Sequence, residues 1–393
     1  MSCMPDMPTG IRLLLAAGGT GGHLFPGIAV AQAAKREAAA EVLFVGTAHG
    51  MEQEVVPRLG FALELIPAEQ LRGRSVWGRL RALWAAMHSI ASAWRILSEF
   101  APDLIFSIGG YASGPTVVAG WICRIPCVLL EPNAIPGLTN RLLGCLATRV
   151  CVGFPRTAVS FPDGKVVCTG NPVRWKAADV SALRGAEAKA DKRVPFTVLI
   201  VGGSAGARRL NQTLPYAFAR LSHLSHLDQQ GDSAGGLQII HQTGKAAQAE
   251  VAHMYEQLGV EAEVVAFIES MDTAYAAADL VICRAGATTV AELTVLGKPA
   301  IFVPYPYAAD DHQRANAEVL VLAGAALMML DAELNAEQLS QAMQALMQDR
   351  SRLKSMAQAA AALGKADATA AVLKECFACL PTLSQTATRE GRQ

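Results

Sequence analysis

The chain has 393 residues, which is too many for one ordinary core and fits two domains of average size. Hydrophobic residues make up 52% of it and charged residues 17%, a composition that excludes an intrinsically disordered protein. Lys plus Arg and Asp plus Glu both number 34, so no overall charge draws the chain to nucleic acid or to an anionic membrane, and any such attraction must come from a local cluster.

The start of the chain lacks the basic segment and apolar run of a signal peptide, and no later stretch holds about 18 uninterrupted apolar residues. We therefore expect a cytoplasmic protein without a membrane-spanning helix. The nine cysteines lie in apolar surroundings, which favours reduced, buried thiols over a disulfide framework. Cys376 and Cys379 form a lone CxxC pair, for which we expect no metal site.

Short apolar runs alternate with longer stretches of helical periodicity. The runs are residues 11–17, 42–45, 104–108, 128–130, 196–201, 263–267, 280–283 and 300–303. This alternation predicts parallel sheets covered by helices on both faces. The runs 11–17 and 196–201 both lead into a Gly-Gly-hydroxyl-x-Gly turn, so each is expected to open its own Rossmann-like, doubly wound domain.

Four segments follow from this repeat. Residues 1–175 are expected to form the first Rossmann-like domain, residues 176–195, rich in Ala and charge, the linker, and residues 196–365 the second Rossmann-like domain. Residues 366–393 are expected to form a helix that packs back on the first domain, followed by a loose tail. Residues 225–236, with Asp, Gln, Ser and Gly, are interpreted as a surface insertion.

The first glycine turn occupies residues 18–23 and leads into a helix with Pro26 near its start. Its backbone N–H groups and the helix dipole would point at one place, where a phosphate or a sugar oxygen could bind. A dinucleotide cofactor is disfavoured, because the third glycine of the usual spacing falls on Leu24 and the second strand ends without a ribose-binding acid. A tight turn without a ligand is the alternative for any one such loop.

Three further strand ends are rich in glycine, at residues 107–114, 202–208 and 284–289. The last is the most informative, because Arg284 ends a strand and the following turn starts a helix that carries Glu292. That layout suits a nucleotide, with phosphate at the helix start and the ribose diol on the Glu292 carboxylate. The alternative for Glu292 is a solvated helix face. Residues 310–316 offer amide and imidazole donors for sugar hydroxyls, or simply a capped helix start.

In their order along the chain, these motifs closely resemble those of the MurG family, the undecaprenyl-diphospho-muramoylpentapeptide β-N-acetylglucosaminyltransferases of peptidoglycan synthesis. The matching motifs are residues 18–23, 109–111, 131–133, 136–140, 170–174, 202–204, 284–292 and 311–313. The resemblance implies a GT-B glycosyltransferase with two Rossmann-like domains and an interdomain cleft. It places the donor UDP-GlcNAc mainly in the C-terminal domain and the acceptor lipid I mainly in the N-terminal domain.

The resemblance also assigns residues to the two substrates. The donor residues are Thr20, Gly21, Gly22, Asn133, Arg174, Ser204, Ile268, Arg284, Ala287, Thr288, Thr289, Val290, Ala291, Glu292 and Gln313, with Arg284 near the base and Glu292 on the ribose. The acceptor residues are Gly19, Tyr111 and Asn140. The chain departs from the family at Leu130 and Pro132, where the family commonly has His and Gln, which leaves the role of that segment open.

The implied reaction moves GlcNAc to the 4-hydroxyl of muramic acid in lipid I with inversion, and it needs a base for that hydroxyl and stabilisation of the leaving UDP. His23 is the candidate base, since an imidazole has suitable basicity and the residue lies at the carboxyl edge of the first sheet. Glu131 is the rival, and His23 could instead only orient a loop or contact a phosphate. No Asp-x-Asp motif stands at a strand end, so we expect no metal cofactor, with helix dipoles, loop amides and Arg174 stabilising the diphosphate.

Residues 71–87 concentrate Arg with Trp and Leu, with apolar side chains at helical spacing. This pattern predicts a peripheral segment on the cytoplasmic face of an anionic inner membrane. Its residues are Arg72, Arg74, Val76, Trp77, Arg79, Leu80, Arg81 and Trp84. An amphipathic helix that packs on the first sheet is the alternative. For the whole chain, a UDP-sugar epimerase or a non-catalytic UDP-sugar-binding protein stays open, and no nucleic-acid partner is expected.

Overall fold

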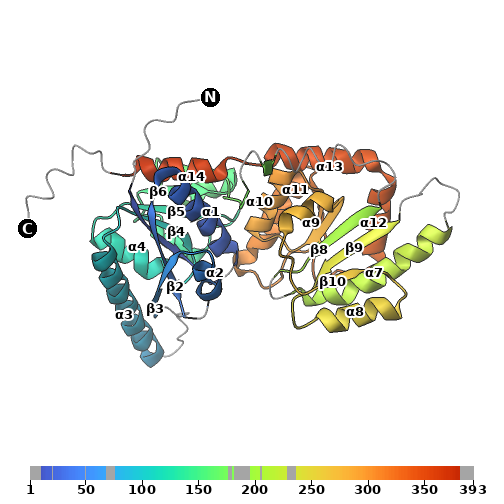
Figure 1. Cartoon of the computed structure of the whole chain (residues 1–393), viewed down its shortest axis with the longest axis horizontal. Helices are drawn as coiled ribbons and strands as arrows, with labels where there is room; N and C mark the ends of the chain where they lie inside the picture. The colour runs from blue at the N-terminus through green and yellow to red at the C-terminus, as the bar shows by residue number, and fades with distance from the viewer. Residues whose placement is uncertain are drawn as a thin grey trace, which may run out of the picture. The chain divides into compact units, whose positions relative to one another are not determined.

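The computed structural model describes residues 10–19, 21–48, 50–67, 76–175, 179–180, 195–203, 206–227 and 236–380, with the side chains of 76–83 and 223–227 left out. The chain divides into two compact units, Met1–Trp175 with Asp367–Gln393, and Lys176–Ala366. Each unit is a parallel sheet with helices on both faces (Figure 1). The predicted fold class, two Rossmann-like domains of the GT-B type, is confirmed. The expected linker 176–195 and insertion 225–236 lie largely outside the described residues.

The first unit has a seven-stranded sheet in the order β3-β2-β1-β4-β5-β6-β7. Its strands are β1 (Arg12–Ala17), β2 (Glu41–Thr47), β3 (Ala62–Ile66), β4 (Leu104–Gly109), β5 (Cys127–Glu131), β6 (Arg149–Val152) and β7 (Val166–Val167). Its helices are α1 (Gly21–Ala38), α2 (Glu52–Arg58), α3 (Val76–Phe100), α4 (Ser113–Ile122), α5 (Leu138–Leu143), the 3₁₀ helix η1 (Pro155–Ser160) and α14 (Ala368–Ala378).

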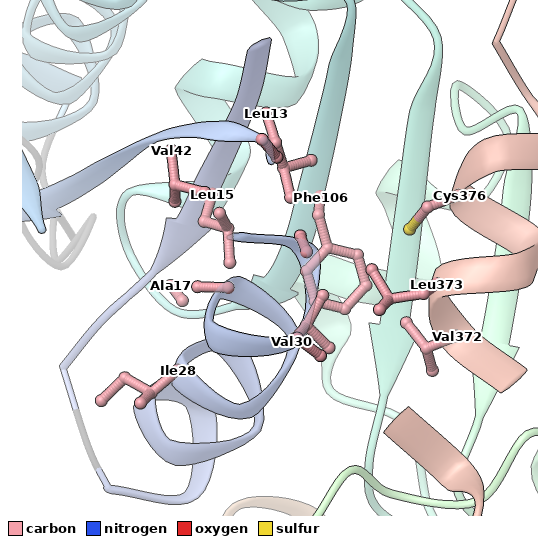
Figure 2. Close-up of a cluster of buried hydrophobic side chains, with 14 of the residues drawn as sticks. Leu13, Leu15, Ala17, Ile28, Val30, Val42, Phe106, Val372, Leu373 and Cys376 are labelled. Carbon is pink, nitrogen blue, oxygen red and sulfur yellow. The ribbon is translucent and has the colours of Figure 1, made fainter. Parts of the chain in front are cut away.

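Alternate residues of the central strands face two separate cores, because successive side chains of a strand point to opposite faces of the sheet. Leu13 and Leu15 pack in one core with Phe106 and residues of α1 (Figure 2). Leu14 packs in the core on the opposite face, with residues of α3 and α4. Strands buried on both faces read as continuous apolar runs, which is why β1, β4 and β5 stand out in the sequence.

Helix α14 packs against α1 and β6 although it lies near the end of the chain. Val372, Leu373 and Cys376 enter the same core as Leu13 and Leu15 (Figure 2). Arg149 Nε lies 3.2 Å from Glu375 Oε2, an ion pair between β6 and α14. Residues 367–380 therefore complete the core of the first unit.

The second unit has a six-stranded sheet in the order β10-β9-β8-β11-β12-β13. Its strands are β8 (Phe196–Val201), β9 (Leu237–Gln242), β10 (Glu263–Val265), β11 (Leu280–Cys283), β12 (Ala300–Phe302) and β13 (Ala326–Met328). Its helices are α7 (Arg208–Leu227), α8 (Gln248–Gln257), α9 (Met271–Ala277), α10 (Ala287–Leu296), the 3₁₀ helix η2 (Ala309–Asp311), α11 (His312–Leu322), α12 (Ala336–Gln348) and α13 (Arg350–Leu363).

Both sheets have a switch point, where the strand order reverses and the loops after two neighbouring strands run in opposite directions. It lies between β1 and β4 in the first unit and between β8 and β11 in the second. Ligands of open α/β sheets bind at the carboxyl edge at such points. The glycine loops found in the sequence follow these four strands, so the fold brings them together in two pairs, one pair in each unit.

Candidate active site

The glycine loops after β1 and β4 approach each other closely at the first switch point. A Cβ on Gly110 would lie 2.5 Å from the carbonyl oxygen of Gly18, and the φ of Gly110 is +88°. A Cβ on Gly109, whose φ is +114°, would lie 3.4 Å from both His23 Nε2 and Asn140 Nδ2. Only glycine combines this backbone conformation with this space. His23 and Asn140 therefore lie beside Gly109 at the carboxyl edge of the sheet.

Glu131, at the end of β5, is 1% exposed and binds hydrogen-bond donors with both carboxylate oxygens. Oε1 accepts from the N–H of Asn133 at 2.9 Å and from its Nδ2 at 3.1 Å. Oε2 accepts from the N–H of Gly137 at 3.0 Å and from Asn140 Nδ2 at 3.0 Å. Burial raises the pKa of Glu131, and these hydrogen bonds oppose the rise. The four donors occupy the lone pairs of the carboxylate, so Glu131 fastens the loop that follows β5.

Asn140 is 3% exposed and links the ends of β4 and β5. Besides Glu131, the carbonyl oxygens of Ile108, at 3.2 Å, and Leu130, at 3.1 Å, lie within hydrogen-bond distance of Nδ2, so its two hydrogens are shared among three acceptors. Within the described part of the chain, its buried Oδ1 has no hydrogen-bond partner. Leu130, which the sequence analysis marked as a departure from the MurG pattern, is fully buried in the first core. A buried strand position suits an apolar side chain, so this departure fits the local packing.

A carboxylate that the sequence analysis missed lies behind the first glycine loop. Glu52, at the start of α2, is 0% exposed, and its Oε2 accepts the N–H of Gly19 at 2.9 Å. Gly19 was predicted to bind the acceptor lipid I, but its backbone N–H donates to the carboxylate of Glu52 instead. In the sequence, the feature that points to this role of Glu52 is its short distance along the chain from Gly46 and Gly50.

The other predicted residues of the first unit lie around the same loops. Gly21, Gly22 and His23 are the first residues of α1 and are half-buried, and Tyr111 is 44% exposed. The exposed Arg174 stacks its guanidinium on the rings of Phe25, at 5.1 Å, and Trp175, at 5.8 Å. Because Phe25 belongs to α1, Arg174 lies near the start of that helix. Thr20 and Ser204 lie outside the described residues.

In the second unit, α10 begins at the switch point, directly after Gly286. Ala287 and Val290 are buried, while Thr288, Thr289 and Ala291 are half-buried. The N–H groups of a first helical turn have no partner within the helix, so a helix start in this place suits an anion.

Arg284 is held in place where β11 ends. Its Nη1 lies 2.6 Å from Asp331 Oδ1, 2.9 Å from the carbonyl oxygen of Val303 and 3.1 Å from that of Pro304, so its two hydrogens are shared among three acceptors. The side chains of Arg284 and Asp331 are only 15% and 11% exposed. Asp331 is a second residue that the sequence analysis missed, and it fixes the direction of the guanidinium.

Glu292 is 4% exposed, and its Oε2 accepts the hydroxyl of Tyr275 at 3.2 Å. The alternative of a solvated helix face is therefore wrong for this residue. Gln313 Oε1 accepts the N–H of Tyr305 at 3.0 Å, so it holds the loop after β12, and Ile268 is half-buried in the loop after β10.

Comparison with known proteins assigns the family. Residues 13–152 match the glycosyltransferase family 28 N-terminal domain, and residues 197–372 match its C-terminal domain. A curated relative from Geobacter sulfurreducens is 45% identical over 369 residues, which are 94% of this chain and 98% of the relative. It is named UDP-N-acetylglucosamine–N-acetylmuramyl-(pentapeptide) pyrophosphoryl-undecaprenol N-acetylglucosamine transferase. The chain belongs to this transferase family, the MurG family.

Solved structures agree with this assignment. The crystal structure of MurG from Acinetobacter baumannii covers 93% of this chain and 99% of its own, with a TM-score of 0.73 and 32% identity. A putative UDP-N-acetylglucosamine 2-epimerase from Listeria monocytogenes covers 93% of this chain and 96% of its own, with a TM-score of 0.63 and 13% identity. So low an identity shows a shared fold and nothing more. This member of the MurG family is a UDP-GlcNAc-dependent glycosyltransferase, and the epimerase alternative is not favoured.

The segment with the predicted membrane residues is described only in part. Arg72 and Arg74 lie outside the described residues, as do the side chains of Val76, Trp77, Arg79, Leu80 and Arg81 in α3. Trp84 is 69% and Met87 62% exposed. The alternative that these two side chains pack on the first sheet is therefore wrong. Ala93, Ile96 and Leu97 form the buried face of α3 instead.

An apolar surface continues from α3 onto α4. Met87, Ile90, Ala91 and Trp94 of α3 line a groove together with Ala119 and Ile122 of α4. Trp94, Trp121 and Ile122 are 56%, 56% and 59% exposed.

Among the helices that the structure describes, none has the length and apolar character needed to cross a membrane. Within the same residues, no three His, Cys, Asp or Glu side chains are grouped so that they could hold a metal ion.

Proposed function

We propose that this chain transfers GlcNAc from UDP-GlcNAc to the 4-hydroxyl of the muramic acid in lipid I, with inversion, and so forms lipid II for peptidoglycan synthesis. The observation that carries the proposal is the 45% identity over 94% of the chain to a transferase named for this reaction. The two switch points, each with a pair of glycine loops, support one substrate position in each unit.

His23 is the general base of the proposal. Glu131 has four donors on its two carboxylate oxygens, so it has no lone pair left for the proton of a substrate hydroxyl. His23 is half-buried beside Gly109, at the edge of the sheet where ligands bind. The base takes the proton of the 4-hydroxyl while that oxygen attacks the anomeric carbon and the bond to the UDP oxygen breaks.

The donor binds in the second unit. The first turn of α10, with Thr288 and Thr289, offers N–H and hydroxyl donors to the diphosphate, and Glu292 accepts the ribose hydroxyls. The helix dipole and the loop amides stabilise the departing UDP, with Arg174 as a further cation. We expect transfer without a divalent ion. A rate that collapses in EDTA and recovers with Mg²⁺ would contradict this.

The acceptor has a polyprenyl chain, so the enzyme works at the cytoplasmic face of the inner membrane. The exposed side chains of Trp84, Met87 and Trp94 on α3 and of Trp121 and Ile122 on α4 support contact with the bilayer, because exposed Trp is typical of membrane interfaces. The arginines Arg72, Arg74, Arg79 and Arg81 add attraction to anionic headgroups.

The test is an incubation of the purified protein with labelled UDP-GlcNAc and a lipid I analogue. We expect a labelled disaccharide lipid. Release of a free epimer would support the epimerase, and donor binding without any product would support a non-catalytic protein.

A further inference from the structure

Glu52 is a buried carboxylate with hydrogen bonds to two different loops. Its Oε2 accepts the N–H of Gly19 at 2.9 Å, in the loop after β1. Its Oε1 accepts the N–H of Thr47 at 2.8 Å and the Thr47 hydroxyl at 3.2 Å, at the end of β2. Within the described part of the chain, no Lys, Arg or His pairs with it. A carboxylate that is 0% exposed and has no cation is costly to bury, and these hydrogen bonds offset the cost.

Three glycines make the space for this carboxylate. A Cβ on Gly18, Gly46 or Gly50 would overlap the side chain of Glu52. None of the three has a φ in the left-handed region, so the reason for glycine at these positions is space and not backbone conformation. The carboxylate and the two loops around it are therefore fitted to each other.

The loop that Glu52 holds leads directly into His23. Gly19 has a φ of +92°, and a chain with this much glycine has many accessible conformations when nothing fixes it. The hydrogen bond from Gly19 to Glu52 ties the loop to the end of the neighbouring strand β2, across 33 residues of sequence. His23 is the third residue of α1, immediately after this loop.

We infer that Glu52 is a positioning residue, which fixes the first glycine loop and through it His23 in the geometry that sugar transfer needs. The inference rests on the proposed function for its catalytic part. The hydrogen bond from Gly19 to Glu52, called the tether below, is a property of the fold, and its effect on the loop can be measured without turnover.

The test is the variant Glu52→Gln, which keeps the shape of the side chain. Thr47 presents two donors, so the amide oxygen of Gln stays with Thr47 and its NH₂ group faces the N–H of Gly19, where no hydrogen bond forms. We expect kcat to fall roughly 10- to 100-fold, with KM for UDP-GlcNAc changed by less than about 2-fold, because positioning acts on the transition state. Deuterium uptake should rise over residues 17–24 and stay unchanged over residues 202–207.

Two further variants serve as a control and as an independent probe. Glu54→Gln alters an exposed acid on the same helix, which pairs with Arg58 at 2.8 Å, and it should leave kcat and deuterium uptake unchanged. Gly50→Ala keeps the charge of Glu52 but places a Cβ against its carboxylate, so it should reproduce the slower turnover. Because both changes act through one tether, the variant with Glu52→Gln and Gly50→Ala should turn over no more slowly than the slower single variant.

The outcomes separate the tether from the reaction. Unchanged deuterium uptake over residues 17–24 in Glu52→Gln rejects the tether. An active wild type together with an unchanged kcat in Glu52→Gln rejects the positioning role and leaves the proposed function standing. A fall in kcat accompanied by raised uptake throughout the first sheet shows a purely structural role, which also rejects the inference. A wild type that forms no disaccharide lipid overturns the proposed function, and the catalytic part of the inference falls with it.

Discussion

The hydroxyl of Tyr275, on α9, donates a hydrogen bond of 3.2 Å to Oε2 of Glu292, on α10. Both side chains are buried, Tyr275 with 1% and Glu292 with 4% of its surface exposed. The carboxylate is thus held in one orientation in the middle of α10, the helix that begins at the second switch point. A hydroxyl already fills one acceptor site of Glu292, in the way that a ribose hydroxyl of the donor would.

The first prediction follows from this pair. Glu292→Gln should weaken UDP binding by about 2–3 kcal/mol, since two charge-assisted hydrogen bonds to the ribose become weaker or are lost. Tyr275→Phe removes only the internal donor and should change UDP affinity by less than about 0.5 kcal/mol if the ribose is the partner that matters. Calorimetric titration with UDP measures both variants. Equal UDP affinity in Glu292→Gln and the wild type would remove Glu292 from the donor site.

The second prediction separates the two candidate bases. His23→Ala should lower kcat by about 10²–10⁴-fold and leave UDP affinity nearly unchanged, because a base acts in the transition state. Glu131→Gln should instead lower the thermal midpoint, since its NH₂ group would face N–H donors of Asn133, Gly137 or Asn140. If His23→Ala loses UDP affinity and keeps its turnover number, His23 is a binding residue and not the base.

The central strands could be read from the sequence because parallel strands covered on both faces are continuously apolar. Strand β9 (Leu237–Gln242) was missed for the opposite reason. It buries the polar side chains of His241 and Gln242, which interrupt the apolar run. Strand β3 is largely exposed, and β7 has only two residues, so neither gives a run long enough to recognise. These strands form because they pair with neighbouring strands of the sheet, and their own sequences give a weaker signal.

The glycine loops and the helix starts after them were also readable, because their chemistry is local. The residues that hold these loops in place could not be identified from the sequence. Glu52 lies 33 residues from Gly19, and Asp331 lies 47 residues from Arg284. No spacing rule links such residues, since only the fold brings them together. The burial of Glu292 likewise depends on Tyr275 from another helix, which helical periodicity does not reveal.

The third prediction concerns pH and His241, which lies in β9. Burial lowers the pKa of this imidazole to about 3, and its ring nitrogens lie 3.0 Å from the Tyr255 hydroxyl and 3.2 Å from Asn211 Oδ1. Between this pKa and the value near 6.5 in an unfolded chain, the unfolded state binds the additional proton. The free energy of unfolding therefore falls as the pH falls from 6.5 to about 3. Above pH 6.5 His241 is neutral in both states, and its contribution to stability no longer changes with pH.

We expect the free energy of unfolding to fall by about 1.4 kcal/mol per pH unit because of this group between pH 6.5 and about pH 3. His241→Gln does not titrate, so its stability should fall less steeply between pH 6.5 and pH 3, although it is less stable at pH 7. Denaturant titrations of both proteins across this range measure the difference. Equal slopes would mean that His241 is not held neutral in the folded protein.

The last prediction concerns the membrane surface. An α3 helix with Trp84 69% exposed and Met87 62% exposed keeps apolar area outside either core, and burying Trp at a bilayer interface recovers that free energy. Each nearby arginine adds up to about 1 kcal/mol of attraction to an anionic surface. Replacing Arg72, Arg74, Arg79 and Arg81 with Gln should therefore abolish sedimentation with anionic vesicles and spare activity on a short-chain, soluble acceptor. The variant Arg352→Gln with Lys354→Gln, on α13 of the second unit, is the charge control and should sediment like the wild type. Full sedimentation of the quadruple variant would show that these arginines do not bind the membrane.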